Sequence, residues 1–246
     1  MSASNSTVSA CEPLPVVDVQ GDRRWINVHE RFLSESVEKE PDVLFLGDSI
    51  FQHLAQTEVW CKMFEPLHSL NFSIGGDQTQ NLLWRICNGE LNDIQPKIIV
   101  ILVGTNNHDH TAEEVCEGIM KIAQTIAEKQ PQSNIIVMGI PPRGKFPNPL
   151  RDKIKQINKL LSTQVSSVPN ASYLHVDEHS FVNHVNGTIS HHDMYDYLHF
   201  TRTGYQKLCE PLWEEIQQLM QTYVKVESTS ADTASIAGEL ASDRTI

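Results

Sequence analysis

The sequence predicts a three-layer α/β/α sandwich built around a five-stranded parallel sheet. Five short apolar runs occur along the chain, amphipathic helical patterns accompany them, and a polar glycine-containing motif follows each of the first three runs. Runs that are apolar at nearly every position are typical of strands buried on both faces of a parallel sheet. Their alternation with helices favours an α/β sandwich with right-handed crossovers.

The five predicted strands are rich in aliphatic and β-branched residues. They are Asp42–Leu46, Ser69–Ile74, Lys97–Val103, Asn134–Met138 and Ser172–Val176.

Helices are predicted between and beyond these strands from the spacing of apolar residues and from capping signals. One precedes the first strand, over about residues 23–37, and the last covers about residues 203–223. Thr111-Ala-Glu-Glu114 is a capping box that predicts a helix start, with the helix ending near residue 129. Asn148-Pro149 predicts the start of another helix.

The composition indicates one folded domain with a polar segment at each end. The chain has 246 residues, of which 40% are hydrophobic, and a single core can account for this length. Residues 1–15 are expected to form a disordered lead, and the small polar residues of 226–246 a disordered tail. The folded domain is therefore expected to occupy residues 16–225.

Charge and cysteine content exclude several classes of protein. The chain has 19 basic and 31 acidic residues, which gives a net charge of −12. It contains no basic stripe, so binding to nucleic acid or to an anionic membrane surface is not expected. The longest unbroken apolar run, Ile98–Val103, is too short to span a bilayer, and the polar N-terminal segment does not resemble a signal peptide. Five widely spaced cysteines form neither a disulfide framework nor a zinc motif, so we expect reduced thiols and a cytoplasmic location.

Three polar motifs follow three consecutive predicted strands, and a fourth lies just before the last helix. They are Gly47-Asp48-Ser49, Gly75-Gly76-Asp77, Gly104-Thr105-Asn106-Asn107 and Asp196-Tyr197-Leu198-His199. Ligands of open parallel sheets bind beyond the carboxyl ends of the strands, so the first three motifs should meet at one edge.

Hydrolysis by a serine nucleophile assigns a role to each motif. A serine hydroxyl needs a base to take its proton, and His199 is the candidate base for Ser49. Asp196 precedes His199 by three residues, so one helical turn would place its carboxylate beside the imidazole and orient it. The backbone N–H groups of Ser49 and Gly76 and the side-chain amide of Asn106 can form an oxyanion hole.

Neighbours of the catalytic candidates suggest a shallow acyl pocket. Ile50 follows the nucleophile, Thr105 precedes the candidate oxyanion asparagine, and Leu198 precedes the base. Two bulky aliphatic side chains and one β-branched side chain in a small space would admit an acetyl group and penalise longer acyl chains.

Two other classes of function remain open at this stage. Acidic and histidine side chains are dense enough for a metal-dependent phosphoesterase, although such a site would leave Ser49 and Asn106 without a role. A non-catalytic interaction subunit on the same fold is the other alternative. The metal-ligating candidates are His108, Asp109, His110, His191, His192, Asp193, Asp196 and His199.

The four motifs resemble those of the SGNH, or GDSL-type, hydrolases. The invariant residues of that family would correspond here to Ser49, Gly76, Asn106 and His199. More specifically, the segments DVLFLGDSI, IGGDQTQNLLWRI, VGTNNHDHTAEEV, PRGKFPNPLR and HHDMYDYLHFT resemble the catalytic α subunits of the intracellular platelet-activating factor acetylhydrolases of type Ib.

This resemblance implies a flavodoxin-like fold and removal of an acetyl group from the sn-2 position of an ether phospholipid. It implies no metal or organic cofactor. It also implies a homodimer, or a heterodimer with a paralogous catalytic subunit, and a WD-repeat β-propeller as regulatory partner.

Overall fold

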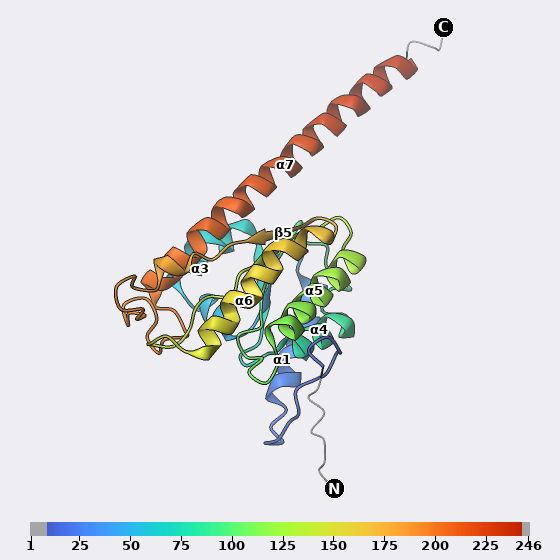
Figure 1. Ribbon diagram of the computed structural model, residues 1–246. Coiled ribbons are helices and arrows are strands. Elements are labelled where there is room, and N and C mark those ends of the chain that lie inside the picture. Colours follow the sequence, from blue (N-terminus) through green and yellow to red (C-terminus); the bar gives the residue numbers. More distant parts are fainter. Residues whose placement is uncertain (1–8, 243–246) are drawn as a thin grey trace.

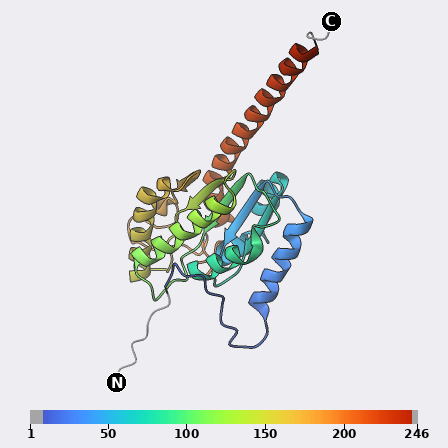
Figure 2. The same ribbon diagram turned by 90° about the vertical axis from the view of Figure 1, so that its right-hand side faces the viewer.

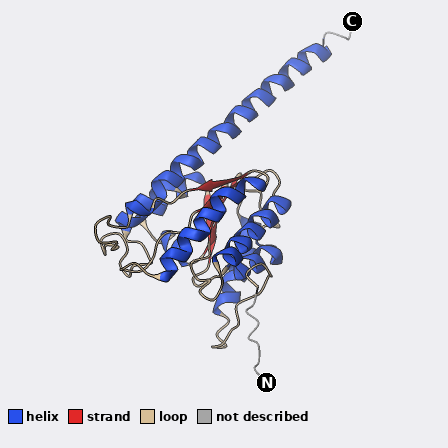
Figure 3. Ribbon diagram, viewed as in Figure 1, coloured by secondary structure: helices blue, strands red, loops and turns tan. Residues whose placement is uncertain are grey.

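A computed structural model describes residues 9–242 and contains a five-stranded sheet in which all four pairings are parallel (Figure 3). The strand order β2-β1-β3-β4-β5 reverses direction at β1, so the ends of β1 and β3 flank a switch point where ligands bind in such sheets. The predicted fold class is confirmed. The strands are β1 (Val43–Gly47), β2 (Ser69–Ser73), β3 (Ile98–Leu102), β4 (Asn134–Met138) and β5 (Ala171–Leu174).

Alternate side chains of the strands enter two separate cores. In β1, Leu44 and Leu46 belong to the cluster on one face, whereas Val43 and Phe45 belong to the cluster on the other. Every residue of β1 and β3 is buried, because both strands lie inside the sheet and both of its faces are covered.

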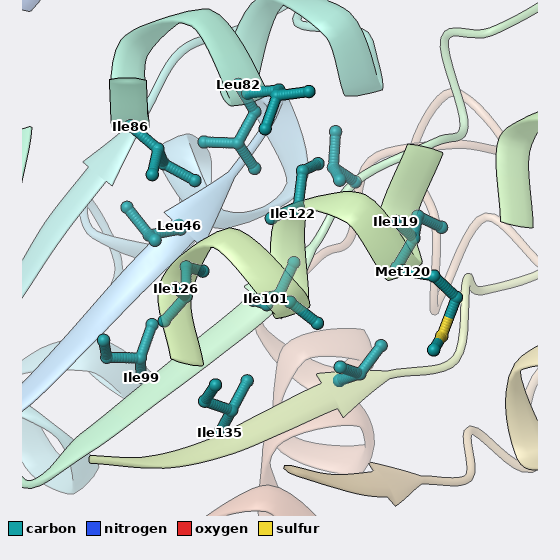
Figure 4. Close-up of a cluster of buried hydrophobic side chains, with 14 of the residues drawn as sticks. Leu46, Leu82, Ile86, Ile99, Ile101, Ile119, Met120, Ile122, Ile126 and Ile135 are labelled. Carbon is teal, nitrogen blue, oxygen red and sulfur yellow. The ribbon is translucent and has the colours of Figure 1, made fainter. Parts of the chain in front are cut away.

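Four helices cover the first face of the sheet (Figures 1 and 2). Figure 4 shows this core, in which Leu82 and Ile86 meet Leu46 of β1 while Ile122 and Ile126 lie over Ile101 and Ile99 of β3. The helices are α1 (Arg24–Glu38), α4 (Thr79–Arg85), α5 (Ala112–Lys129) and α6 (Pro149–Gln164).

The second face is covered by α2 (Ser49–Leu54), α3 (Glu58–Met63) and the first turns of α7 (Arg202–Ser242). The sequence pattern did not predict α2, α3 or α4, because helices of six or seven residues are too short to show a 3.6-residue period. Shorter helical segments complete the chain: η1 (Glu65–Leu67), the π-helical η2 (Ile86–Glu90), η3 (Val165–Ser167) and η4 (Glu178–Ser180).

The predicted capping box is present at the start of α5. The Thr111 hydroxyl accepts from the Glu114 N–H at 3.2 Å, and the Glu114 carboxylate accepts from the Thr111 N–H at 2.7 Å. Asn148 caps α6 by accepting from the Arg151 N–H at 3.1 Å. Both helices therefore begin where their local sequence indicates.

The expectation of a disordered lead is wrong for residues 9–15. Ala10 is buried, and its carbonyl accepts from the Thr79 hydroxyl at 2.9 Å. The Leu14 N–H donates to the Gln80 carbonyl at 3.1 Å, and the Leu14 carbonyl accepts from the Asn81 side chain at 2.9 Å. These bonds to α4 fix the segment, which local composition could not reveal. The rest of the lead, residues 1–8, lies outside the described residues.

The last helix is longer than the sequence predicts. It continues through Ser242 and extends well beyond the sheet and its covering helices (Figures 1 and 2). Residues 226–242 contain no proline and four alanines, so their local helix propensity is compatible with continuing the helix. The sequence predicts a disordered tail over 226–246, whereas the structure is helical over 226–242. Residues 243–246 lie outside the described residues. A functional boundary at residue 225 stays a prediction.

Among the described residues, no helix has the length and apolar character that crossing a membrane requires. All five cysteines are free thiols, and Cys116 and Cys209 are buried.

Candidate active site

Ser49 is the first residue of α2, directly beyond the end of β1. Asp48 caps this helix, because its carboxylate accepts from the Ile50 N–H at 2.9 Å. Gly47 is required just before it, since a Cβ at this position would lie 2.4 Å from the Leu102 carbonyl oxygen of β3. The close contact between β1 and β3 thus fixes the backbone at the end of β1. Ser49 follows this point and lies half-buried at the edge of the sheet.

The structure brings Ser49, His199 and Asp196 into one hydrogen-bonded chain. Ser49 Oγ lies 2.8 Å from His199 Nε2, and His199 Nδ1 lies 2.6 Å from Asp196 Oδ2. A serine bonded to a histidine that a carboxylate orients is the geometry expected for an activated nucleophile. Their catalytic roles remain a proposal that rests on this geometry.

The turn that joins Asp196 to His199 is not helical, so the interpretation of one helical turn is wrong. Tyr197 has a left-handed φ of 64°, and Asp196 Oδ1 accepts from the N–H groups of Leu198 at 3.0 Å and His199 at 2.7 Å. Burial alone would raise the pKa of Asp196, but these bonds and the His199 side chain bring it below its usual value. The carboxylate itself therefore builds the loop that presents the histidine.

Two further side chains lie against the imidazole of His199. The His53 ring centroid is 4.6 Å from that of His199, and the Tyr195 ring stacks on His199 at 6.0 Å. Burial, followed by the His199 charge, lowers the pKa of His53. Neither residue was predicted for the site, because nothing local to positions 53 and 195 indicates that they pack against position 199.

The loop after β2 lies directly beside Ser49. A Cβ at Gly75 would lie 3.6 Å from Ser49 Cβ, and the Gly75 N–H donates to Gln52 Oε1 at 3.0 Å. Gly76 has a φ of 86°, a backbone conformation that disfavours any other residue. A Cβ at this position would have no atom within 4 Å, so the space beside Gly76 is open. Gly76 is therefore an exposed residue that directly follows the one beside the nucleophile.

Asn106 is bound to this same loop from the end of β3. Its side-chain Nδ2 donates to the Asp77 carbonyl at 3.0 Å, and its own carbonyl accepts from Gln78 Nε2 at 2.9 Å. A primary amide has two N–H groups, so one remains for a ligand after the bond to Asp77. The structure thus places Ser49, Gly76 and Asn106 around one edge of the sheet, and an oxyanion hole formed by them stays a prediction.

A buried ionic cluster supports the loop and was not predicted from the sequence. Asp77 accepts from Arg85 Nε at 2.8 Å and from Trp25 Nε1 at 2.7 Å. Arg85 also pairs with Glu90, which in turn lies 2.9 Å from His29 Nδ1. Burial lowers the pKa of Arg85, but the two carboxylates raise it further, so the guanidinium stays charged. The arginine inside the apolar stretch LLWRI could have indicated burial, but no local signal identifies its carboxylate partners.

Asp48 is fully buried beside the nucleophile, and its Oδ2 has no hydrogen-bond partner in the described structure. Burial raises its pKa to about 7, although the bond from the Ile50 N–H and the Arg143 charge oppose this rise. The group that caps α2 therefore titrates near neutrality.

The three expected acyl-pocket residues have different surroundings. Ile50 is 1% exposed within the second core cluster, and the hydroxyl of the buried Thr105 accepts from Arg143 Nη1 at 3.2 Å. Leu198 is half-buried and lines a cavity next to Asp196. Contact of these residues with an acyl group stays a prediction.

An apolar hollow of about 470 Å³ adjoins the glycine loop. Val16, Val17 and Val19 line it on one side, and Ile74 and Gly76 on the other. Val17 is 74% exposed and Val19 is 89% exposed, within a run of exposed residues from 12 to 24, so their apolar side chains face solvent.

The histidine-rich motifs do not assemble a metal site. Within residues 9–242, no group of three or more His, Cys, Asp or Glu side chains is placed to hold an ion. Asp193 instead pairs with Lys207 at 2.9 Å, and His191 bonds to the Tyr197 hydroxyl. The ligand set that a metal-dependent phosphoesterase needs is therefore not formed by these residues.

The chain is similar in sequence and in fold to known proteins. The chain is 53% identical over 211 residues, 86% of its length and 90% of the relative's, to platelet-activating factor acetylhydrolase IB subunit alpha1 of Homo sapiens. It is 50% identical over 230 residues, 94% of its length and 99% of the relative's, to subunit alpha2 of Rattus norvegicus. In fold, it is similar to a carbohydrate esterase family 3 structure from Talaromyces cellulolyticus, with a TM-score of 0.57 and 16% identity over 74% of this chain and 99% of that one.

The family model of the GDSL-like lipases and acylhydrolases matches residues 45–207, from the middle of β1 into α7. This range contains the predicted nucleophile Ser49, the two other predicted oxyanion residues, Gly76 and Asn106, and the Asp196–His199 turn. The family model covers more than half of the chain, and relatives with 50% and 53% sequence identity align over most of it. The chain therefore belongs to the GDSL-like lipase/acylhydrolase family.

Proposed function

We propose that this protein is a serine esterase that removes the acetyl group from the sn-2 position of ether phospholipids like platelet-activating factor. The observation that carries the proposal is the chain of hydrogen bonds from Ser49 through His199 to Asp196, at 2.8 and 2.6 Å. The names of the relatives support the substrate class.

In the proposed reaction, His199 Nε2 takes the proton of Ser49 Oγ as the oxygen attacks the acetyl carbonyl carbon. Asp196 holds the imidazole in the required tautomer and stabilises the imidazolium. The N–H groups of Ser49 and Gly76 and the amide of Asn106 bind the oxyanion. His199 then protonates the leaving lipid oxygen, and a water molecule hydrolyses the acetyl-Ser49 ester to acetate by the same steps.

The apolar hollow beside Gly76 supports a lipid substrate, since its valine lining is suited to an alkyl chain. No step requires a metal or an organic cofactor.

A labelling and turnover experiment tests the proposal. Ser49→Ala should lower kcat by several orders of magnitude without loss of folding, because the change removes the nucleophile and opens no core cavity. Wild type should react with a serine-directed phosphonate at Ser49 and be indifferent to a chelator. Activity of the variant within tenfold of wild type would refute the serine mechanism, and inhibition by the chelator would favour the metal alternative. A correctly folded wild type that reacts with neither phosphonate nor ester would favour the non-catalytic alternative.

We also propose that the protein works as a subunit of an assembly, as the relatives' names, subunit alpha1 and subunit alpha2, indicate for those proteins. The family resemblance implies a homodimer or a heterodimer with a paralogous subunit, and a WD-repeat β-propeller partner. A monomer mass by light scattering at micromolar concentration would contradict the homodimer.

A further inference from the structure

A second cavity, of about 580 Å³, lies next to the Asp196–His199 turn. The loop of residues 143–148 forms one wall, and Asp196, Tyr197 and Leu198 form the other. Asp196 is two hydrogen bonds from Ser49, through His199, so this cavity adjoins the Ser49–His199–Asp196 chain.

The loop is held in place before any ligand arrives. The Gly144 N–H donates to the Tyr197 carbonyl at 2.8 Å, which joins the two walls. Asn148 Nδ2 donates to the Arg143 carbonyl at 2.9 Å, and the buried Arg151 donates to the Gly144 carbonyl. These bonds fix the backbone of this wall, which lowers the entropic cost of binding.

Two cations of this loop line the cavity without a direct carboxylate partner. Within the described residues, the side chain of Arg143 makes hydrogen bonds only to the carbonyl and hydroxyl of Thr105, through Nη1. Lys145 Nζ lies over the rings of Phe146 and Tyr197, at 5.3 and 5.8 Å from their centroids. Five other lysines form ion pairs with carboxylates, namely Lys39, Lys62, Lys97, Lys155 and Lys207.

These cations are unexpected in a chain with a net charge of −12. Arg143 interacts at longer range with Asp48 and Asp196, which raise its pKa, while its burial lowers the pKa more strongly. Its Nε and Nη2 groups bond no other described residue. Asp196 lines the same cavity, but its carboxylate oxygens are already bonded by His199 and by the N–H groups of Leu198 and His199. The guanidinium and ammonium donors of Arg143 and Lys145 are therefore suited to an anion with several acceptor oxygens.

We propose that the cavity lined by Arg143 and Lys145 is a subsite for the phosphoryl group of the ester substrate. The inference rests on the proposed function, because it places the substrate's ester at Ser49 and its phosphate a few bonds away. The two aromatic rings keep Lys145 over the cavity, and the hydrogen bonds to Thr105 keep Arg143 beside it.

The test compares an acetyl ester that carries a phosphocholine group with a matched ester that lacks it, at constant ionic strength. One is a short-chain 1-alkyl-2-acetylglycerophosphocholine, and the other is the matched neutral 1-alkyl-2-acetylglycerol. The variant is Lys145→Gln, since Lys145 is exposed and its loss opens no cavity. Arg143 is left unchanged because it also binds the carbonyl next to Asn106. Lys121→Gln on α5 is the matched control, as it removes one exposed charge away from the site.

The ratio of kcat/KM for the phosphate-bearing ester to that for the neutral ester should fall about tenfold in Lys145→Gln, mainly through KM. It should change less than about twofold in Lys121→Gln, and Lys145→Arg should restore it. An unchanged ratio in Lys145→Gln, or equal losses on both esters, would overturn the subsite.

A binding measurement separates this outcome from failure of the proposed function. Calorimetry with glycerol 3-phosphate should detect binding to wild type that is weakened in Lys145→Gln, and none with glycerol. Inorganic phosphate serves as a third probe. If it competes as well as glycerol 3-phosphate, the site holds free phosphate and the assignment to substrate fails. If neither ester is hydrolysed, the esterase proposal fails while the calorimetry still decides on the anion site.

Discussion

Arg85 and Asp77 form an ion pair in which both side chains are completely buried, with Arg85 Nε 2.8 Å from Asp77 Oδ2. The backbone carbonyl of the same Asp77 accepts from Asn106 Nδ2 at 3.0 Å. The cluster therefore holds the loop to which the candidate oxyanion amide is bound. Breaking a buried ion pair typically costs about 3–5 kcal/mol, because one charge is left uncompensated.

Asp77→Asn should lower both stability and kcat. The ion pair to Arg85 is lost, and the loop that carries Gly76 and holds Asn106 loses its support, so kcat should fall about tenfold or more with little change in KM. Glu90→Gln is the matched control, since it removes the other carboxylate of Arg85 without touching the loop. Urea unfolding and steady-state kinetics measure both effects. Equal kcat values in two equally destabilised variants would show that Asp77 acts on stability alone.

Asn106→Ala should lower kcat by about 10²–10³-fold and change KM much less, because the amide binds charge that develops in the transition state. The adjacent Asn107→Ala is the control. Its buried amide bonds Thr79 and Gln80 instead, so it should reduce stability more than turnover. Kinetics on a soluble acetyl ester give the comparison. A change confined to KM would make Asn106 a substrate-binding residue.

Asp48 should make the protein less stable as pH rises towards neutrality. Its carboxyl has a folded pKa of about 7 against an ordinary value of 3.8, so the folded state binds the extra proton between these values. Stability from this group is complete below the lower value and is lost as pH rises through the upper one, by at most about 1.4 kcal/mol per pH unit.

Asp48→Asn removes this titration and keeps a side chain that can cap α2. The difference in the free energy of unfolding between Asp48→Asn and wild type should therefore shift in favour of the variant from about pH 5 to about pH 7.5. Urea unfolding at several pH values measures it. Parallel pH profiles for the two proteins would show that Asp48 keeps an ordinary pKa.

Ile50→Ala should reduce stability and also relax selectivity for the acetyl group. The side chain is buried in the second core cluster, so its truncation should cost about 2–5 kcal/mol. Because Ile50 follows Ser49, the space left should admit longer acyl groups and raise kcat/KM for butyryl and hexanoyl esters relative to acetyl.

Leu54→Ala, one turn later in α2 and equally buried, should lose stability without this change in selectivity. Kinetics at a temperature where both variants are folded give the comparison. If both variants keep the acyl profile of wild type, Ile50 is a core residue only.

The fold and the order of the catalytic candidates follow from the sequence because their signals are local. A β-branched apolar run of five or six residues that ends at a glycine-containing turn indicates a buried strand, and the end of such a run places Ser49 or Asn106 at the sheet edge. The capping signals at Thr111 and Asn148 act over three residues, so the starts of α5 and α6 could be predicted closely.

Tertiary structure alone decided what depends on partners far apart in the chain. Nothing local to Arg85 identifies Asp77 and Glu90 as its buried partners, and nothing local to residues 9–15 shows that α4 binds them. The spacing of Asp196 and His199 is compatible with a helical turn. In the folded loop, Tyr197 is instead left-handed, and the Asp196 carboxylate accepts from the His199 N–H, which brings the two side chains together. Burial and charge pairing are properties of the whole packed chain, because desolvation and long-range contacts set their energies, and local periodicity does not contain them.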